Sequence, residues 1–242
     1  MEDIRRILER YDTYLDNKDT RGAEKCLEFW LGEALLSGEK GNALTILNEQ
    51  IGLYRNLSLK EKCFTAIDRA LSTAEELLLK DDPAMGTTLI NAATGYRAFN
   101  DAQRALPLYE RAAVIYEKYL DPLDRRTAAL YNNMAVSLSY LKRYDEAEAS
   151  FRKAIGIMEK AGNGESEMAV SYCSMADMAY EQYGPLESDP YVNGYLEKAA
   201  ELLKSPAAVR DRNFRFNCEK CLNAFKRHGW FAVCEEIEAQ IH

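Results

Sequence analysis

Cysteine and histidine side chains are the obvious candidates for metal, redox or catalytic chemistry in this sequence. Cys218 and Cys221 form a CxxC, and His228 and Cys234 follow it, which suits a metal or redox site. No second CxxC completes a set of four zinc ligands, however. Residues three apart share one face of a helix, so the alternative is that these thiols are small buried hydrophobes. We favour the buried alternative and predict no metal and no cofactor.

Catalytic arrangements are missing from the rest of the chain. The two histidines, His228 and His242, belong to no Ser-His-Asp triad and to no HExxH helix. Gly162-Asn163-Gly164 is an isolated glycine pair that fits no nucleotide-binding motif. We therefore predict that the chain is not an enzyme.

Amide and guanidinium side chains recur at a regular interval, and both types can bind a peptide. Asn91 lies 42 positions before Asn133, and Arg55 lies 42 positions before Arg97. A primary amide donates and accepts, so it can pair with the backbone of an extended peptide whatever the peptide's side chains. A guanidinium can hold a carboxylate. Side chains with this spacing need a scaffold that repeats with the same period.

That scaffold follows from an internal repeat. Residues 88–118 align without a gap with residues 130–160, so that Tyr109 meets Phe151. Apolar residues recur at helical spacing on both sides of the polar turn at 142–145, so each copy is expected to be a two-helix hairpin. One hairpin cannot bury its apolar face alone, and stacked copies are therefore required.

The composition agrees with an array of helices. The chain is 47% apolar, and its 13 Gly and 6 Pro provide too few turns for a many-stranded sheet. We predict one all-α solenoid over residues 1–242, made of about six helical hairpins. The repeats are 43–80, 85–120, 127–161 and 167–204, and degenerate hairpins at 1–40 and 209–242 close the two ends. The fourth repeat is expected to contain a longer internal loop, from Gln182 to Gly194.

The alternation of small and large side chains resembles the tetratricopeptide repeat. The matching positions are Tyr131, Met134, Ala135, Leu138, Ala147, Phe151 and Ala154 in one copy, and Leu89, Ala92, Ala93, Tyr96, Ala105, Tyr109 and Ala112 in another. The 42-residue period and the string at 130–135 look most like the kinesin-light-chain type of repeat. The resemblance implies a right-handed α-α superhelix whose first helices line a concave, ligand-binding surface.

The outward positions of those first helices can be read from the period. The candidate ligand-binding residues are Asn48, Arg55, Asn91, Arg97, Asn132, Asn133, Tyr140, Asp177 and Tyr180, and the same period also places Thr94 and Cys173 outward. In this interpretation the asparagines bind a peptide backbone and the arginines select for charge. The alternative is that these polar side chains are solvated, or that the asparagines bridge adjacent helices.

The predicted function is a non-catalytic scaffold or adaptor that binds a protein or an extended peptide segment. The alternative function is a peptide-sensing component of a bacterial signalling system that acts through a partner protein. A net charge of −8 argues against nucleic acid as a partner, since phosphate binding needs basic surfaces. No stretch approaches 18 apolar residues, so no membrane partner is expected.

The compartment is inferred from the start of the chain and from its cysteines. The first residues are charged and contain no secretory signal, so we predict a cytoplasmic protein with reduced thiols. An exposed end of a solenoid can pair with a second copy of itself, which leaves a homodimer open.

Overall fold

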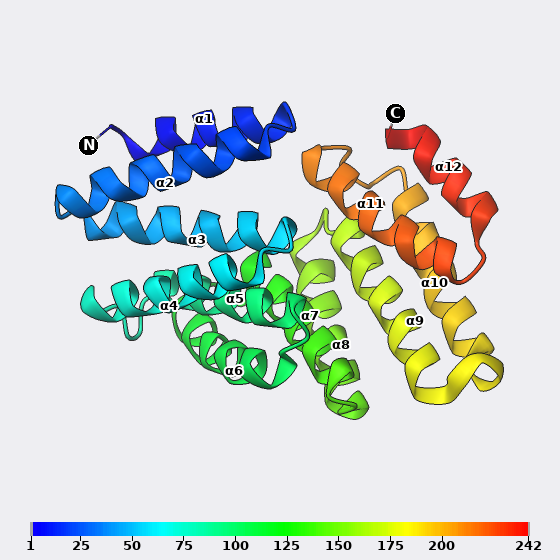
Figure 1. The fold of residues 1–242 in the computed structure, drawn as a ribbon. Coiled ribbons are helices and arrows are strands. Elements are labelled where there is room, and N and C mark those ends of the chain that lie inside the picture. Colours follow the sequence, from blue (N-terminus) through cyan, green and yellow to red (C-terminus); the bar gives the residue numbers. More distant parts are fainter. Residues whose placement is uncertain (1, 242) are drawn as a thin grey trace. The chain divides into compact units, whose positions relative to one another are not determined.

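The computed structural model describes residues 2–241, and these residues form twelve helices and no strand. The helices are α1 (Ile4–Asp16), α2 (Thr20–Leu36), α3 (Lys40–Asn56), α4 (Lys60–Glu76), α5 (Pro83–Ala98), α6 (Ala102–Tyr119), α7 (Arg125–Tyr140), α8 (Tyr144–Ala161), α9 (Glu165–Glu187), α10 (Asp189–Lys204), α11 (Arg212–Arg227) and α12 (Phe231–Ile241). Consecutive helices form hairpins (Figure 1). The prediction of an all-helical fold built from hairpins is confirmed. Within residues 2–241, no helix combines the length and the apolar character needed to cross a bilayer.

The chain divides into two compact units. Unit 1 ends at Ile115 and unit 2 begins at Tyr116, so the boundary falls inside α6. The first helices of the hairpins are α1, α3 and α5 in unit 1, and α7, α9 and α11 in unit 2. One continuous solenoid over the whole chain remains a prediction, and the two units are described separately below.

The turns inside the hairpins share one backbone geometry. In five of the hairpins, the second residue after the first helix has a left-handed φ: Lys18 at 57°, Ser58 at 57°, Asn100 at 62°, Lys142 at 59° and Gly229 at 78°. A left-handed residue at this place ends a helix and turns the chain back. Glycine is the residue that adopts it without strain, yet only one of the five turns uses glycine. The turn geometry therefore repeats although its residue does not.

The hairpin of α9 and α10 departs from this pattern, and here the prediction of a long loop is wrong. Residues expected to form a loop from Gln182 to Gly194 are mostly helical. The change of direction occurs at Gly184, whose φ is 79°, immediately before Pro185. After Gly184 the chain completes another helical turn before α10 begins at Asp189. The additional residues therefore extend a helix instead of a loop.

Small residues allow the helices of unit 1 to pack closely. Ala92, Ala93 and Gly95 of α5 are buried. A Cβ atom at Gly95 would come within 2.8 Å of the end of the Ile67 side chain of α4, so a larger residue would require Ile67 to shift. Tyr109 is completely buried, in the position that the repeat predicts for a large side chain. This interlocking of small and large residues is what dense helix packing requires.

The cysteines of unit 2 are part of its core. Cys218 and Cys221 are fully buried and Cys234 is 3% exposed, as the repeat register predicts. Burial raises the pKa of the Cys218 thiol to about 12, which keeps it protonated and unreactive. Cys173 was expected to face outward, but it is buried in the same cluster, so that expectation is wrong. No group of three or more His, Cys, Asp or Glu side chains among residues 2–241 is arranged to hold a metal ion.

Candidate functional site

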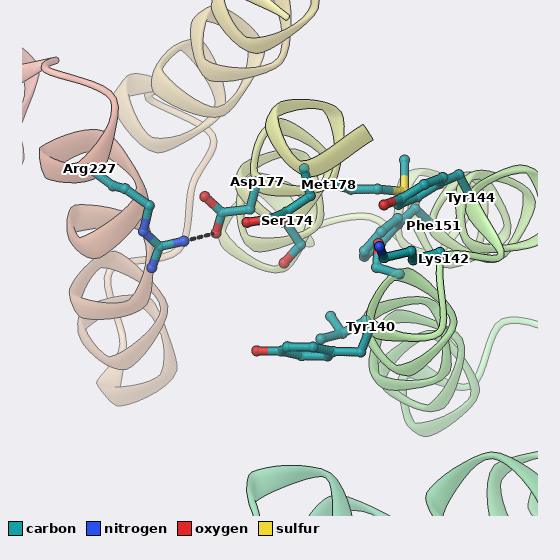
Figure 2. A pocket seen from close by; sticks show the side chains of 11 residues that line it. Tyr140, Lys142, Tyr144, Phe151, Ser174, Asp177, Met178 and Arg227 are labelled. Carbon is teal, nitrogen blue, oxygen red and sulfur yellow. Dashed lines mark ion pairs between the residues drawn. The ribbon is translucent and has the colours of Figure 1, made fainter. Parts of the chain in front are cut away.

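A pocket opens between the first helices of unit 2. Helix α9 packs between α7 and α11, and a cavity of about 280 Å³ lies along this face (Figure 2). Its lining residues are Val136, Ser139, Tyr140, Lys142, Tyr144, Phe151, Ser174, Asp177, Met178, Glu181 and Arg227. Helices far apart in sequence therefore combine to form one pocket, at the place that a repeat array offers to a ligand.

The pocket has an apolar floor and a mixed rim. Phe151 is completely buried, and Met178 is 5% exposed. Tyr140 lies at the rim with 62% of its surface exposed, and Figure 2 shows its ring beside the opening. An exposed aromatic above buried apolar groups is suited to an apolar side chain of a bound segment.

Asp177 lines the end of the pocket near α11 and contacts residues at the C-terminal end of that helix. Its carboxylate forms an ion pair with Arg227 Nη1 at 2.6 Å, and His228 Nε2 lies 3.0 Å from its other oxygen. The ring of Tyr180 meets His228 edge-on, with centroids 5.5 Å apart. Asp177 and Tyr180 are therefore both committed to contacts with the α11 turn. The sequence gave no indication that His228 contacts Asp177, because the two residues are 51 positions apart.

A smaller cavity of about 130 Å³ lies on the same three helices and contains both asparagines predicted on α7. Asn132 Oδ1 accepts from the Ser171 hydroxyl at 2.9 Å, so this amide bridges α7 and α9. The Asn133 side chain is half-buried and has no hydrogen bond within the part of the chain that the structure describes. Of the two amides, Asn133 is the one with its hydrogen-bonding capacity available to a ligand.

The asparagines of unit 1 bond to each other. Asn91 Nδ2 donates to Asn48 Oδ1 at 3.0 Å, and Asn48 Nδ2 donates to the Thr88 hydroxyl at 3.1 Å. These contacts join α3 to α5, which is the bridging alternative that the sequence left open. Thr94 was expected to face outward, but it is buried and shares a 2.9 Å hydrogen bond with the Tyr109 hydroxyl. That expectation is wrong, because Thr94 belongs to the contact between α5 and α6.

The two arginines of unit 1 lie in the last turns of α3 and α5. Arg55 contacts Asn56 Oδ1 at 3.3 Å. Burial, followed by the nearby positive charge of Arg97, lowers the pKa of Arg55. Arg97 Nε is buried without a hydrogen-bond partner among residues 2–241. The two arginines are therefore close enough for their charges to interact, and the ligand-binding role given to them from the sequence stays a prediction.

Sequence reasoning missed the floor of the larger pocket. Phe151 and Met178 were counted as core positions or left unassigned, yet both line the cavity. An apolar residue at these positions of the repeat is expected both in a filled core and at the floor of a pocket. Nothing in the spacing distinguished these two cases.

Comparisons with known proteins place the fold. The family model of the tetratricopeptide repeat matches residues 126–184, which run from α7 to the kink in α9. No curated protein matches the chain in sequence. Solved structures do match it in shape.

The structure of BtubC (BKLC) from P. vanneervenii is similar, with a TM-score of 0.70 and 18% identity over 86% of this chain and 84% of that one. A putative kinesin light chain from Podospora anserina, with nearly identical TPR-like repeats, has a TM-score of 0.51 and 14% identity over 82% of this chain and 92% of that one. A Rap protein complexed with Competence and Sporulation Factor has a TM-score of 0.63 and 14% identity, over 100% of this chain and 64% of that one. At these identities the likeness concerns the fold alone.

Proposed function

We propose that this chain, which matches the tetratricopeptide-repeat family model over residues 126–184, binds an extended peptide segment of a partner protein in the groove of unit 2. The groove is defined here as the face of α7, α9 and α11 that carries the two cavities. Arrays of this family are protein-binding scaffolds, so the family supports the class of function. We assign the binding to the residues that line this groove.

The apolar floor is the observation that carries the proposal. Phe151 of α8 and Met178 of α9 are buried, yet both also line a cavity of about 280 Å³. A cavity of this size accommodates one large apolar side chain. Tyr140, with 62% of its surface exposed, would lose most of that exposure on top of such a side chain.

The polar part of the groove can bind the backbone of the same segment. Asn133 has a donor and an acceptor available, and both are needed to pair with a peptide unit. Lys220 and Glu167 also line this smaller cavity and give it charges of both signs. Recognition would then combine a sequence-independent amide contact with one apolar anchor.

The proposed activity is binding without catalysis. A cytoplasmic location and the exclusion of nucleic acid and membranes as partners stay predictions from the sequence. Self-association as a homodimer also stays open, and sedimentation analysis of the purified chain would decide it.

A second candidate is a peptide-sensing regulator that acts through a partner protein. The match of the entire chain to a Rap protein solved with a bound factor favours this candidate. Both candidates share the peptide-binding step. They differ because a regulator must change its affinity for a partner protein when the peptide binds.

The test selects peptides from a random-sequence display library on the full-length protein and measures their affinities by fluorescence anisotropy. Tyr140→Ala and Asn133→Ala are each expected to weaken binding about tenfold, which corresponds to about 1.4 kcal/mol. Tyr119→Ala is the matched control, because Tyr119 is 45% exposed and does not line the groove. Selected peptides that bind all three variants with wild-type affinity would refute the groove as their site.

A further inference from the structure

Arg55 and Arg97 form a pair of half-buried positive charges in unit 1. They project from the last turns of α3 and α5, two first helices that contact each other. Within residues 2–241 neither guanidinium forms an ion pair with a carboxylate, and the contact of Arg55 with Asn56 Oδ1 is a long 3.3 Å. The pair therefore lacks a counter-charge.

This arrangement is unfavourable as it stands. Like charges close to each other repel, and partial burial strengthens the repulsion because less water screens it. The lowered pKa of Arg55 reflects both causes, first its burial and then the charge of Arg97. Arg97 Nε adds a second cost, since a buried donor without a partner has lost its hydrogen bond to water.

Some other basic side chains of unit 1 form ion pairs with acidic residues. Lys62 contacts Glu24 at 2.6 Å, Lys40 contacts Glu76 at 2.8 Å, and Arg104 contacts Asp101 at 3.4 Å. These three cations are all at least half exposed. Arg55 and Arg97 are more buried than these three cations, yet neither has a counter-charge within residues 2–241.

We propose that Arg55 and Arg97 together bind an oxyanion, either a carboxylate or a phosphate group. Two guanidinium groups offer forked donors that match the paired oxygens of these anions. A bound oxyanion would neutralise the repulsion between the two arginines and give Arg97 Nε an acceptor. The site belongs to unit 1 and does not depend on the peptide groove proposed for unit 2.

A purely structural role makes a different prediction. Cations in the last turn of a helix interact favourably with its dipole, so loss of either arginine would then destabilise the protein. In our proposal, removal of one arginine relieves repulsion in a chloride buffer of low ionic strength that contains no phosphate or carboxylate. Arg97→Gln should then raise the unfolding temperature, by about 1–4 °C for a chain of this size.

The experiment measures thermal unfolding of the full-length chain in inorganic phosphate, in glutarate and in chloride at equal ionic strength. We expect phosphate or glutarate to raise the unfolding temperature of the wild type above its value in chloride. Arg97→Gln and Arg55→Gln should each weaken the apparent affinity for that anion at least tenfold. Arg111→Gln is the control for the change in charge, because Arg111 is exposed in the same unit and should leave the anion response intact.

The two anions identify the source of the ligand group. A response to glutarate alone assigns the site to carboxylates, a response to phosphate alone assigns it to phosphates, and a response to both assigns it to oxyanions in general. Equal unfolding temperatures of the wild type in all three salts would overturn the proposal. An anion response that persists unchanged in Arg97→Gln and Arg55→Gln would overturn it as well. Two independent variants keep the test decisive if one of them fails to fold.

Discussion

The charged side chains on the first helices of the two units differ in whether they have ion-pair partners. In unit 2 the carboxylate of Asp177 has two partners, Arg227 and His228, both from the α11 turn. In unit 1 the charge of Arg97 contributes to the lowered pKa of Arg55, and neither guanidinium forms an ion pair with an acid within residues 2–241. The repeat determines where a side chain is placed along the first helix. It does not determine which partner the side chain meets there, and so one charge has its counter-charges while the other two have none.

The largest effects should come from the core position that both units share. Tyr109 of unit 1 and Phe151 of unit 2 occupy equivalent places in the repeat and are completely buried. Replacement of either by alanine should lower the free energy of unfolding by about 3–5 kcal/mol, because it leaves a large cavity. Hydrogen exchange followed by mass spectrometry locates the loss of protection.

If the units are distinct, Phe151→Ala should expose amides mainly beyond Tyr116, and Tyr109→Ala should expose amides mainly before it. Loss of protection across the whole chain in both variants would show one cooperative array, as in the single solenoid predicted from the sequence.

The fold was predictable from the sequence because every copy of the hairpin repeats one pattern of small and large residues. In one copy the pattern predicts buried positions at Ala105, Tyr109 and Ala112, and all three side chains are buried in the structure. The bend at Gly184 was not predictable in the same way. A glycine followed by a proline indicates a change of direction, but both a loop and a kinked helix satisfy that signal.

The site was only partly predictable, because the period relates the helices but does not determine which side chains meet across them. Asn91 and Asn133 are equivalent by the repeat, yet Asn91 bonds to Asn48 while Asn133 has no such bond. Asn91 meets an amide of the neighbouring helix α3, whereas Asn133 has no such partner within the described residues. Thr94 and Cys173 show the same limit, since small polar residues tolerate either face of a helix.

Substitution of the two equivalent asparagines sharpens this contrast. Asn91→Ala leaves Asn48 Oδ1 without its donor, and it should lower the free energy of unfolding by about 1 kcal/mol. Asn133→Ala removes no hydrogen bond within the described residues, so its stability should stay within about 0.5 kcal/mol of the wild type. Urea unfolding followed by circular dichroism measures both. Equal destabilisation by the two substitutions would contradict the assignment of Asn133 as an available amide.

Asp177 and Arg97 should respond in opposite directions to loss of charge. Asp177→Asn weakens the contacts with Arg227 and His228, and it should destabilise the chain by about 0.5–1 kcal/mol, since the ion pair is partly exposed. Arg97→Gln should stabilise the chain in the absence of phosphate and carboxylate anions, as argued above. The same urea titration, performed at low and at high salt, should show both differences shrinking as salt screens the charges. A change of the same sign in both variants would remove the electrostatic contrast between the units.

The smallest expected effects concern two glutamates whose pKa values are shifted in opposite directions. Burial, followed by the charge of Asp12, raises the pKa of Glu49 above 4.5, whereas hydrogen bonds from Lys153 and then Tyr131 lower the pKa of Glu117 below 4.5. The folded chain takes up a proton at Glu49 before the unfolded chain does, so the cost of ionised Glu49 disappears as pH falls towards 4.5. The stability from Glu117 is complete above 4.5 and is lost as pH falls through its lowered pKa.

Glu49→Gln should therefore stabilise the protein at neutral pH and lose this advantage in acid. Glu117→Gln should destabilise it at neutral pH and lose that penalty in acid. Urea midpoints measured between about pH 3 and pH 7 for the wild type and both variants test the two signs together. Parallel pH profiles for the two variants would show that the local surroundings of these carboxyl groups do not differ between unit 1 and unit 2.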